Sequence, residues 1–236
     1  MSTEKHTFFC EDPSVGHLSA EESNHAIRVL RLTTGQTIGI MDGKGSYYRA
    51  RITVPNKKQV HFEIETTFVQ NPPQNNLHIA IAPTKSMDRF FFFLEKAIEI
   101  GVQQITPLLT SHSERKKIND EKIQKQAIGA MKQSGQLYQP VIDPLTSIND
   151  FLEADHSEFQ RFIAHCEEDK AKIAFKDTFQ IDKNILILIG PEGDFTPEEI
   201  NLAIANNFRP VSLGESRLRT ETAGIVACHT VSILSS

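Results

Sequence analysis

The sequence ILILIGPEGDFTPEE, residues 185–199, passes from an apolar run to a polar segment through a short turn that contains two glycines. Its first five residues are all apolar, which favours a strand buried on both faces of a sheet. Thr196-Pro197-Glu198-Glu199 then carries the signals of a helix start, with a capping threonine, an early proline and a glutamate three residues after the cap. The order predicts a strand, a turn and a capped helix, which is a building unit of α/β proteins.

A second polar segment follows a shorter strand candidate. VSL, residues 211–213, precedes Gly214 and RLRTETAG, residues 217–224, and the last of these enters a helix for which Thr220 is the predicted cap. An arginine at a helix N-terminus opposes the helix dipole, so Arg219 suggests a polar or anionic ligand nearby. Taken alone, the GPEG turn is better explained as purely structural. The second segment shifts the balance toward a ligand site.

The chain upstream of these segments alternates strands with helices. Helices are predicted from a cap at Asp88 to Gly101 and over residues 119–135. Phe90 to Phe93 are consecutive, and one helix face cannot bury all of them, so Phe91 or Phe92 is expected at another contact. About six parallel strands joined by crossovers are predicted, at residues 77–82, 105–109, 141–142, 162–164, 185–189 and 211–213.

Residues 1–70 follow a different pattern, typical of a small β-barrel. Strands are predicted at 37–41, 47–54 and 60–64, with a hairpin turn at Asp42-Gly43-Lys44-Gly45. A capping box at Ser19–Glu22 predicts one inserted helix. Residues 71–76 are polar and proline-containing, which is typical of a linker. The predicted organisation is therefore a domain at 1–70, a linker at 71–76 and an α/β domain at 77–236.

Composition limits the possible functions. The net charge is −5, which argues against a generally basic protein that coats nucleic acid but allows a local basic groove. The three cysteines are widely spaced and the nine histidines lack paired-ligand spacing, so neither disulfides nor a metal site are expected. The fingerprints of dinucleotide and NTP binding are missing, which disfavours a dehydrogenase or an NTP-dependent enzyme. Without an apolar signal core or a membrane-length run, a cytoplasmic location and no membrane partner are expected.

Basic residues follow two predicted strands of the α/β domain. Lys85 and Arg89 come after the strand at 77–82, and Arg115 and Lys117 come after the strand at 105–109. Ligands of open α/β sheets bind at this carboxyl edge. For each residue alone a solvated surface explains the charge equally well, but two clusters on the same edge suit a polyanion. His25, Arg28 and Arg31 share one helix face in the first domain, where a solvated surface is the favoured interpretation and phosphate contact the alternative.

Several of these motifs together resemble one family. IGPEG at 189–193, LG at 213–214 and LRTETA at 218–223 closely resemble the RsmE family of SPOUT RNA methyltransferases. HAIRVLR at 25–31 with Gly35, EKAIEIGV at 95–102, and QSG at 133–135 with Pro140 also look like signatures of that family. The resemblance spans nearly the whole chain in the right order. Two departures are Asp194, where a third glycine is usual, and Glu215-Ser216, where a proline-containing step is usual.

The resemblance implies a fold and a function. It implies an N-terminal PUA-like β-barrel and a SPOUT α/β domain with a C-terminal trefoil knot at about 185–236. It also implies a homodimer that uses S-adenosylmethionine to methylate N3 of a uridine in 16S rRNA of the small ribosomal subunit. Two alternatives stay open, namely a SPOUT-type RNA-binding protein without activity and a methyltransferase that acts on a different RNA.

The resemblance also implies roles for single residues. Arg219 would stabilise charge that develops on the uracil oxygens, while Glu221 or water would accept the N3 proton. His165 and Glu167 are weaker candidates for the rim of the donor pocket. The seven basic residues named above would contact rRNA phosphates. The walls of the methyl-donor pocket would be formed by Ile189, Gly190, Glu192 and Gly193 on one side and by Leu213, Gly214, Leu218, Thr220, Thr222 and Ala223 on the other.

Overall fold

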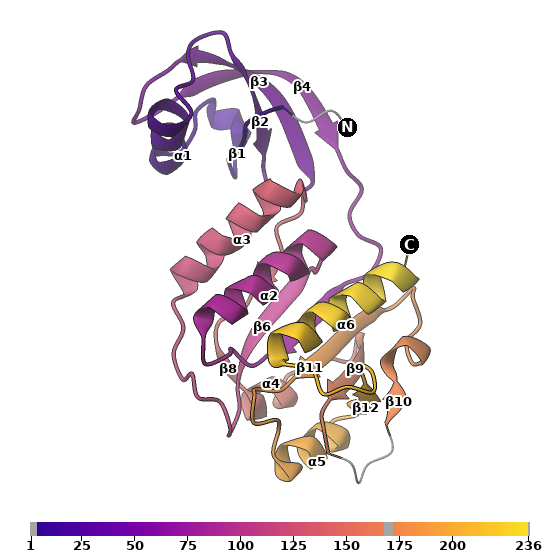
Figure 1. The fold of residues 1–236 in the computed structure, drawn as a ribbon. Helices are drawn as coiled ribbons and strands as arrows, with labels where there is room; N and C mark the ends of the chain where they lie inside the picture. Colours follow the sequence, from indigo (N-terminus) through magenta and orange to yellow (C-terminus); the bar gives the residue numbers. More distant parts are fainter. Residues whose placement is uncertain (1–3, 168–171, 236) are drawn as a thin grey trace. The chain divides into compact units, whose positions relative to one another are not determined.

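The computed structural model describes residues 4–167 and 172–235. The chain divides into two compact units, drawn in Figure 1. The first unit comprises Met1–Pro72 and Met131–Gln139, and the second comprises Pro73–Ala130 and Pro140–Ser236. The segment 131–139, from the end of one helix and the following turn, therefore belongs with the N-terminal residues.

The first unit is built on a four-stranded sheet. Its strands, in sheet order, are β1 (Thr7–Phe9), β2 (Thr37–Met41), β3 (Ser46–Val54) and β4 (His61–Val69). β1 is parallel to β2 and the other pairs are antiparallel. The predicted hairpin between β2 and β3 is confirmed, and the carboxylate of Asp42 accepts hydrogen bonds from the backbone N–H groups of Lys44 and Ser46 at 2.8 and 3.0 Å.

Short helical segments complete this unit: η1 (Pro13–Val15), α1 (Ala20–Asn24) and the π-helical turn η2 (His25–Val29). Ser19 caps α1 as predicted, since its hydroxyl accepts the N–H of Glu22. The expected reciprocal half of the capping box is wrong. The carboxylate of Glu22 instead accepts the N–H of Phe9 at 3.2 Å and binds Lys132 Nζ at 2.6 Å, which ties the segment 131–139 to this unit. The apolar core beneath includes Phe8, Ile38, Ile40, Ile52 and Phe62.

The second unit contains a parallel sheet, as predicted. Among the described residues the strand order is β10-β12-β9-β11-β5-β6-β7, and β8 pairs separately with β6. All of these pairs are parallel. The prediction omitted the two-residue strands β8 and β10. The strands are β5 (Leu77–Ile81), β6 (Gln104–Leu109), β7 (Val141–Ile142), β8 (Thr146–Ser147), β9 (Phe159–Ala164), β10 (Ile173–Ala174), β11 (Asn184–Ile189) and β12 (Arg209–Ser212).

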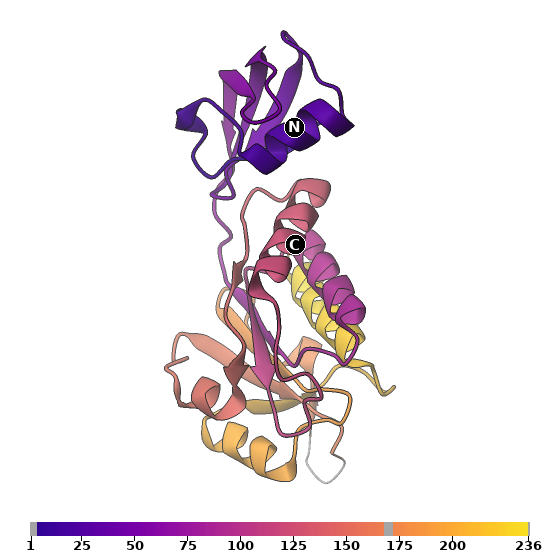
Figure 2. The same ribbon diagram turned by 90° about the vertical axis from the view of Figure 1, so that its left-hand side faces the viewer.

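Helices cover both faces of this sheet (Figures 1 and 2). On one face α2 and α6 lie side by side, close enough that a methyl group on Gly224 would stand 2.5 Å from the ring of Phe93. On the other face residues of α4 and α5 pack with Ala80, Leu186 and Leu188 in a buried cluster. The helices are α2 (Met87–Ile100), α3 (Asp120–Ser134), α4 (Ile148–Glu153), the short η3 (Phe175–Asp177), α5 (Pro197–Ala205) and α6 (Thr220–Leu234).

Two local predictions for α2 have different outcomes. The predicted cap at Asp88 is wrong, because the helix begins at Met87 and Asp88 lies in its first turn. The prediction about the four phenylalanines is confirmed. Phe90 and Phe93 are buried, Phe92 is 52% exposed, and the ring of Phe91 is half-buried with Lys122 Nζ 4.8 Å from its centroid.

Candidate functional site

A pocket of about 760 Å³ lies at the carboxyl ends of β9, β11 and β12. Because neighbouring parallel strands end at the same edge, the loops that follow them converge there. Its volume falls in the range of small-molecule sites. The pocket joins segments that are far apart in the sequence: it is lined by residues of 164–166, Lys172, 189–192, Asp194, 211–220 and Ala223.

The first wall is the turn after β11. A Cβ on Gly190 would stand 3.1 Å from the ring of Phe195, so a side chain there would require that ring to shift by a few tenths of an ångström. Thr196 caps α5 and closes a full capping box with Glu199, which confirms the predicted helix start. The other carboxylate oxygen of Glu199 accepts the N–H of Ser111 at 2.8 Å, which connects the turn to the loop after β6.

Asp194 occupies a left-handed backbone position in this wall, with φ +64°. L-residues other than glycine adopt this region at a cost, which aspartate reduces through local hydrogen bonds. Its carboxylate accepts the N–H of Phe195 at 2.9 Å and the N–H of Cys166 at 2.7 Å. Asp194, which departs from the family pattern, therefore fits the backbone conformation of this turn. Asp194 keeps the backbone conformation that suits a glycine and ties the turn to the loop after β9.

The second wall runs from the end of β12 to the start of α6. Gly214 has φ +147°, a conformation that other residues rarely adopt. The hydroxyl of Ser212 donates to the Gly214 carbonyl at 2.8 Å and accepts the Gly214 N–H at 3.3 Å. Leu213 and Leu218 supply half-buried apolar side chains to the lining. The wall thus combines a glycine turn, closed by the Ser212 hydroxyl, with apolar surface.

The start of α6 differs from the prediction. Thr220 is not the cap, because Arg219 occupies the N-cap position and makes no side-chain capping bond. Thr220 is the first helical residue, and its buried hydroxyl donates to the carbonyl of Gly190 at 3.0 Å. This bond joins the second wall to the first. The exposed side chain of Arg219 lines the pocket at the helix N-terminus.

Glu221, the residue after Thr220, does not line the pocket. Its side chain is buried and is not part of the pocket lining. One carboxylate oxygen stands 4.0 Å from Nε of Arg89, and the other makes no hydrogen bond within the described residues. The structure therefore places Arg219 at the pocket and Glu221 behind it, against α2.

A third side of the pocket comes from the loop after β9. Arg217 of the RLRTETAG segment lines the second wall, and on this third side His165 lines the pocket as predicted, together with Cys166 and Lys172, which sequence reasoning missed. Partial burial, together with the nearby Asp194 carboxylate, raises the pKa of the Cys166 thiol and keeps it neutral. Nζ of Lys172 donates to the carbonyl of His165 at 3.0 Å. No local motif marks Cys166 and Lys172, because their place depends on the pairing of β9 with β11.

Most residues predicted for the donor pocket do line this one. Three do not belong to the lining: Gly193, Thr222 and Glu167. Gly193 lies next to the lining and packs against His112, because a Cβ on Gly193 would stand 3.1 Å from the Cβ of His112. The lining includes Ile189, Gly190, Glu192, Leu213, Gly214, Leu218, Thr220 and Ala223.

The basic residues of the second unit follow β5 and β6 along the chain, and the backbone N–H of Lys85 donates to the carboxylate of the pocket residue Glu192 at 3.0 Å. Lys85 Nζ pairs with Glu114 at 2.7 Å, and this hydrogen bond raises the pKa of Lys85. The guanidinium of Arg115 donates to the carbonyl of Lys85 at 2.7 Å, so the loops after β5 and β6 are joined. Arg89 and Lys117 are exposed. In the first unit His25, Arg28 and Arg31 are exposed, but the prediction that they share one helix face is wrong for Arg31, which follows the end of η2 with φ +55°.

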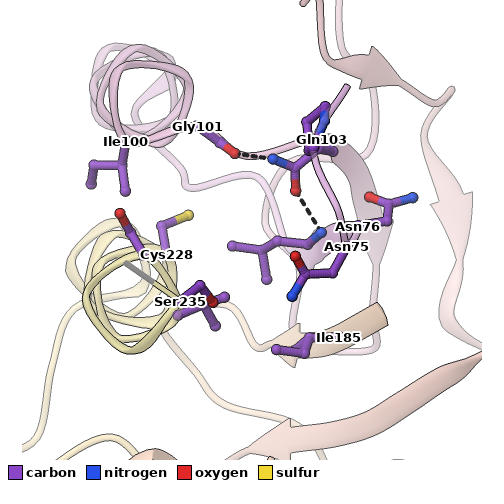
Figure 3. A pocket seen from close by; sticks show the side chains of 12 residues that line it. Asn75, Asn76, Ile100, Gly101, Gln103, Ile185, Cys228 and Ser235 are labelled. Carbon is purple, nitrogen blue, oxygen red and sulfur yellow. Dashed lines mark hydrogen bonds between the residues drawn. The ribbon is translucent and has the colours of Figure 1, made fainter. Parts of the chain in front are cut away.

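A smaller pocket of about 170 Å³ lies at the opposite edge of the sheet, near the start of β5 (Figure 3). Ile100, the last residue of α2, and Cys228, from the middle of α6, belong to its lining, and burial raises the pKa of the Cys228 thiol. It includes none of the predicted site residues.

Across residues 4–167 and 172–235, no group of three or more His, Cys, Asp or Glu is placed to hold a metal ion. None of the helices in those ranges has the length and apolar character needed to cross a membrane.

Comparison with known proteins gives the class of this fold and site. A family model described as an RNA methyltransferase domain matches residues 70–232, and one described as an RNA methyltransferase PUA domain matches residues 18–65. A protein from Buchnera aphidicola named ribosomal RNA small subunit methyltransferase E is 30% identical, over 89% of this chain and 84% of its own. The fold and pocket are therefore those of a two-domain RNA methyltransferase.

Solved structures agree over the whole chain. A probable rRNA-methyltransferase from Porphyromonas gingivalis is 38% identical with a TM-score of 0.90, and the match covers 98% of this chain and 100% of the other. A ribosomal RNA small subunit methyltransferase E from Neisseria gonorrhoeae, solved with S-adenosyl methionine, is 28% identical with a TM-score of 0.84, covering 98% of each chain. The chain belongs to the ribosomal RNA small subunit methyltransferase E family, the RsmE family.

Proposed function

We propose that this protein transfers the methyl group of S-adenosylmethionine to N3 of one uridine in the 16S rRNA of the small ribosomal subunit. The observation that carries the proposal is the single pocket formed by the two motif segments 189–194 and 213–223, whose sequences match the family. Relatives that match over the whole chain carry the rRNA methyltransferase name, and one was solved with the methyl donor bound.

The pocket suits the methyl donor chemically. The adenine ring of the methyl donor needs flat apolar contacts and a few hydrogen-bonding groups at its edge. Leu213, Leu218 and Ala223 offer the apolar contacts, and the lining also includes polar residues such as Ser216 and Arg217. The donor supplies an electrophilic methyl group on a sulfonium, which needs no metal to activate it. The remaining task of the protein is to position the uracil and to handle its proton.

Arg219 is the proposed catalytic residue. Its side chain belongs to the pocket lining, and its N-cap position leaves the guanidinium without a capping role. Arginine stays protonated and is a poor base, but its planar fork of N–H groups stabilises negative charge on oxygen. As the N3 proton of uracil leaves, negative charge develops on the neighbouring carbonyl oxygens. Arg219 would stabilise that charge.

The acceptor of the N3 proton is either Glu221 or water. The buried position of Glu221 behind the pocket, with Arg89 as its charged neighbour, favours water. Glu221 would then orient the Arg89 guanidinium on the exposed side of α2. A Glu221→Gln variant separates the two roles, because loss of a general base lowers kcat by about 10²–10⁴-fold, whereas loss of an orienting ion pair acts mainly on RNA affinity.

The basic residues of both units are the proposed rRNA contacts. In the second unit these are Lys85, Arg89, Arg115 and Lys117, which follow the carboxyl ends of β5 and β6 along the chain. In the first unit they are His25, Arg28 and Arg31, within the region that matches the PUA family model. Phosphate contacts of this kind position an RNA without reading its sequence.

Three further properties follow from family membership and belong to the proposal. The protein would act as a homodimer in the cytoplasm, where its rRNA substrate is located. Residues 185–236, which supply both motif walls of the pocket, would form the trefoil knot. The predicted division into a barrel at 1–70, a linker at 71–76 and a SPOUT domain at 77–236 would describe the two functional parts.

The decisive experiment maps methylated uridines in small-subunit rRNA from a strain that lacks this protein. One uridine should lose its N3-methyl group, and purified protein with S-adenosylmethionine should restore it on subunits from that strain. Full methylation in the deletion strain would contradict the proposal. Methylation of a tRNA or of large-subunit rRNA by the purified protein would keep the enzyme and change its substrate.

A further inference from the structure

Three consecutive residues of the first pocket wall are held from outside the pocket. The carboxylate of Glu192 accepts the backbone N–H of Lys85 at 3.0 Å. The ring nitrogen Nδ1 of His112 stands 3.0 Å from the carbonyl oxygens of both Gly193 and Asp194. Both of those partners are acceptors, so Nδ1 carries the proton and donates to them. Each of the residues 192–194 is thus tied to a loop that follows another strand.

The two loops that make these ties carry three of the candidate rRNA contacts, Lys85, Arg115 and Lys117. We call residues 82–86 and 110–119 the basic loops; they follow β5 and β6. They are joined to each other by the Lys85–Glu114 ion pair and by the Arg115 bond to the Lys85 carbonyl. Ordering of one basic loop should therefore also order the other loop and the pocket wall.

The wall has a conformation that needs such support. Asp194 lies at φ +64°, and its carboxylate is already used by Phe195 and by Cys166 on the third side of the pocket. A left-handed residue without these bonds would relax to a commoner backbone conformation. Because His112 is packed against Gly193, with 3.1 Å between its Cβ and the position of a Cβ on that glycine, the ring also limits how far the wall can move.

We infer that His112 is a positioning residue that couples rRNA binding to methyl-donor binding. Contact of rRNA with the basic loops would fix the loop after β6, and His112 would transmit that ordering to the wall at Gly193 and Asp194. The two ligands then assist each other, and linkage requires the same factor in both directions. The inference rests on the proposed function, since it assumes that this pocket takes the donor and that these loops contact rRNA.

The experiment measures this coupling directly. S-adenosylhomocysteine, the demethylated donor, is titrated into the full-length protein by calorimetry, without and with saturating small-subunit rRNA from a strain that lacks the protein. The wild type should bind it more tightly when rRNA is present, by about 5-fold or more, the lower end of typical allosteric coupling. His112→Ala should weaken binding without rRNA by about 3- to 10-fold, as expected for the loss of one hydrogen bond. It should also bring the coupling factor close to one.

Two variants control for a merely structural role. His112→Asn places an amide N–H near the position of Nδ1, so it should restore both the affinity and the coupling. His229→Ala removes an exposed histidine of α6 outside the pocket and should change neither. Urea unfolding of each variant reports any loss of global stability.

The outcomes separate this inference from the proposed function. A wild type that methylates rRNA but shows equal affinities with and without rRNA would overturn the coupling alone. The same conclusion follows if His112→Ala keeps the wild-type coupling factor. A wild type that binds no S-adenosylhomocysteine at all would instead overturn the proposed function.

Discussion

The hydroxyl of Thr220 donates a hydrogen bond of 3.0 Å to the carbonyl oxygen of Gly190, thirty positions earlier in the chain. Both groups are buried, and the bond joins the two walls of the candidate donor pocket. It is made by a residue whose sequence context predicted a helix cap. Thr220 instead makes this tertiary contact, and Arg219 occupies the N-cap position of α6.

Thr220→Val should therefore destabilise the protein and weaken donor binding together. The substitution keeps the shape but leaves the buried Gly190 carbonyl without its donor, which costs about 1–3 kcal/mol. Urea unfolding measures the stability, and calorimetry with S-adenosylmethionine measures the affinity. Thr220→Ser should retain both properties. Thr230→Val, which removes a hydroxyl bonded to the Val226 carbonyl within the same helix, is the matched control and should leave the affinity unchanged. Equal affinities of the Thr220→Val variant and the wild type would refute the link between the walls.

Arg219→Lys should lower kcat and leave the donor affinity unchanged. Lysine keeps the positive charge but loses the planar fork, and loss of one such stabilising group lowers kcat by about 10²–10³-fold. The measurement is transfer of labelled methyl groups to small-subunit rRNA with both substrates saturating. Arg209→Lys is a matched control, because Arg209 is an exposed residue of β12 whose guanidinium stacks 4.6 Å from the ring centroid of Phe162 and is absent from the pocket lining. Near-wild-type turnover by Arg219→Lys would remove the catalytic assignment.

Lys117→Ala should weaken rRNA binding more than Lys85→Ala. The charge of Lys85 is offset by Glu114 at 2.7 Å, whereas Lys117 is exposed in the same loop region. Removing a lysine that contacts a phosphate reduces the salt slope of binding by about 0.7–1. The salt dependence of rRNA binding by filter retention provides the measurement. An unchanged slope in Lys117→Ala would exclude this lysine from the rRNA interface.

Gly224→Ala and Gly129→Ala should have opposite effects on stability. An added methyl at Gly224 would stand 2.5 Å from the ring of Phe93 and 2.9 Å from Ile81, so α2 and α6 would have to separate. Overpacking of this kind costs about 1–3 kcal/mol. At Gly129, in α3, nothing lies within 4 Å of the added carbon, and helix propensity favours alanine by about 1 kcal/mol. Thermal and urea unfolding of the two variants test the pair, and stabilisation by Gly224→Ala would show that the helices tolerate a wider spacing.

His78 should make stability fall at acidic pH. Its ring is buried at the start of β5, and this burial lowers its pKa from 6.5 to about 4, against the opposing effect of Asp143. Between those values the unfolded chain binds a proton that the folded chain does not bind. The free energy of unfolding therefore decreases as the pH falls from 6.5 to 4, by about 3 kcal/mol from this group.

The variant His78→Gln isolates this contribution. Its amide can still donate to the Thr106 hydroxyl, which His78 Nε2 contacts at 2.7 Å, but it cannot take up a proton. Urea unfolding at pH 7.5 and 4.5 should show a smaller loss in the variant than in the wild type. His229→Gln, at an exposed position, should lose as much stability as the wild type. Equal losses in all three proteins would mean that His78 titrates normally in the folded state.

Local sequence signals were reliable where a few neighbouring residues determine the structure. The apolar run at 185–189 became a buried central strand, and Thr196 with Glu199 formed the expected capping box. The parallel arrangement followed from the alternation of strands and helices. The signals failed where a side chain had a more favourable partner at a distance. Glu22 binds Phe9 and Lys132 instead of completing the predicted capping box, and Thr220 binds Gly190 instead of capping α6.

The sequence by itself therefore determined the two-part organisation into β and α/β regions, the strand, turn and capped helix at 185–199, and the motifs that identify the family. Only the tertiary structure decided that Arg219 lines the pocket while Glu221 lies behind it, and that Cys166, Lys172 and Arg217 share the site. It alone decided that His112 holds the carbonyls of Gly193 and Asp194. The physical reason is that helix and turn signals act over a few bonds, whereas the order β9-β11-β5-β6 brings together loops that are separated by many tens of residues.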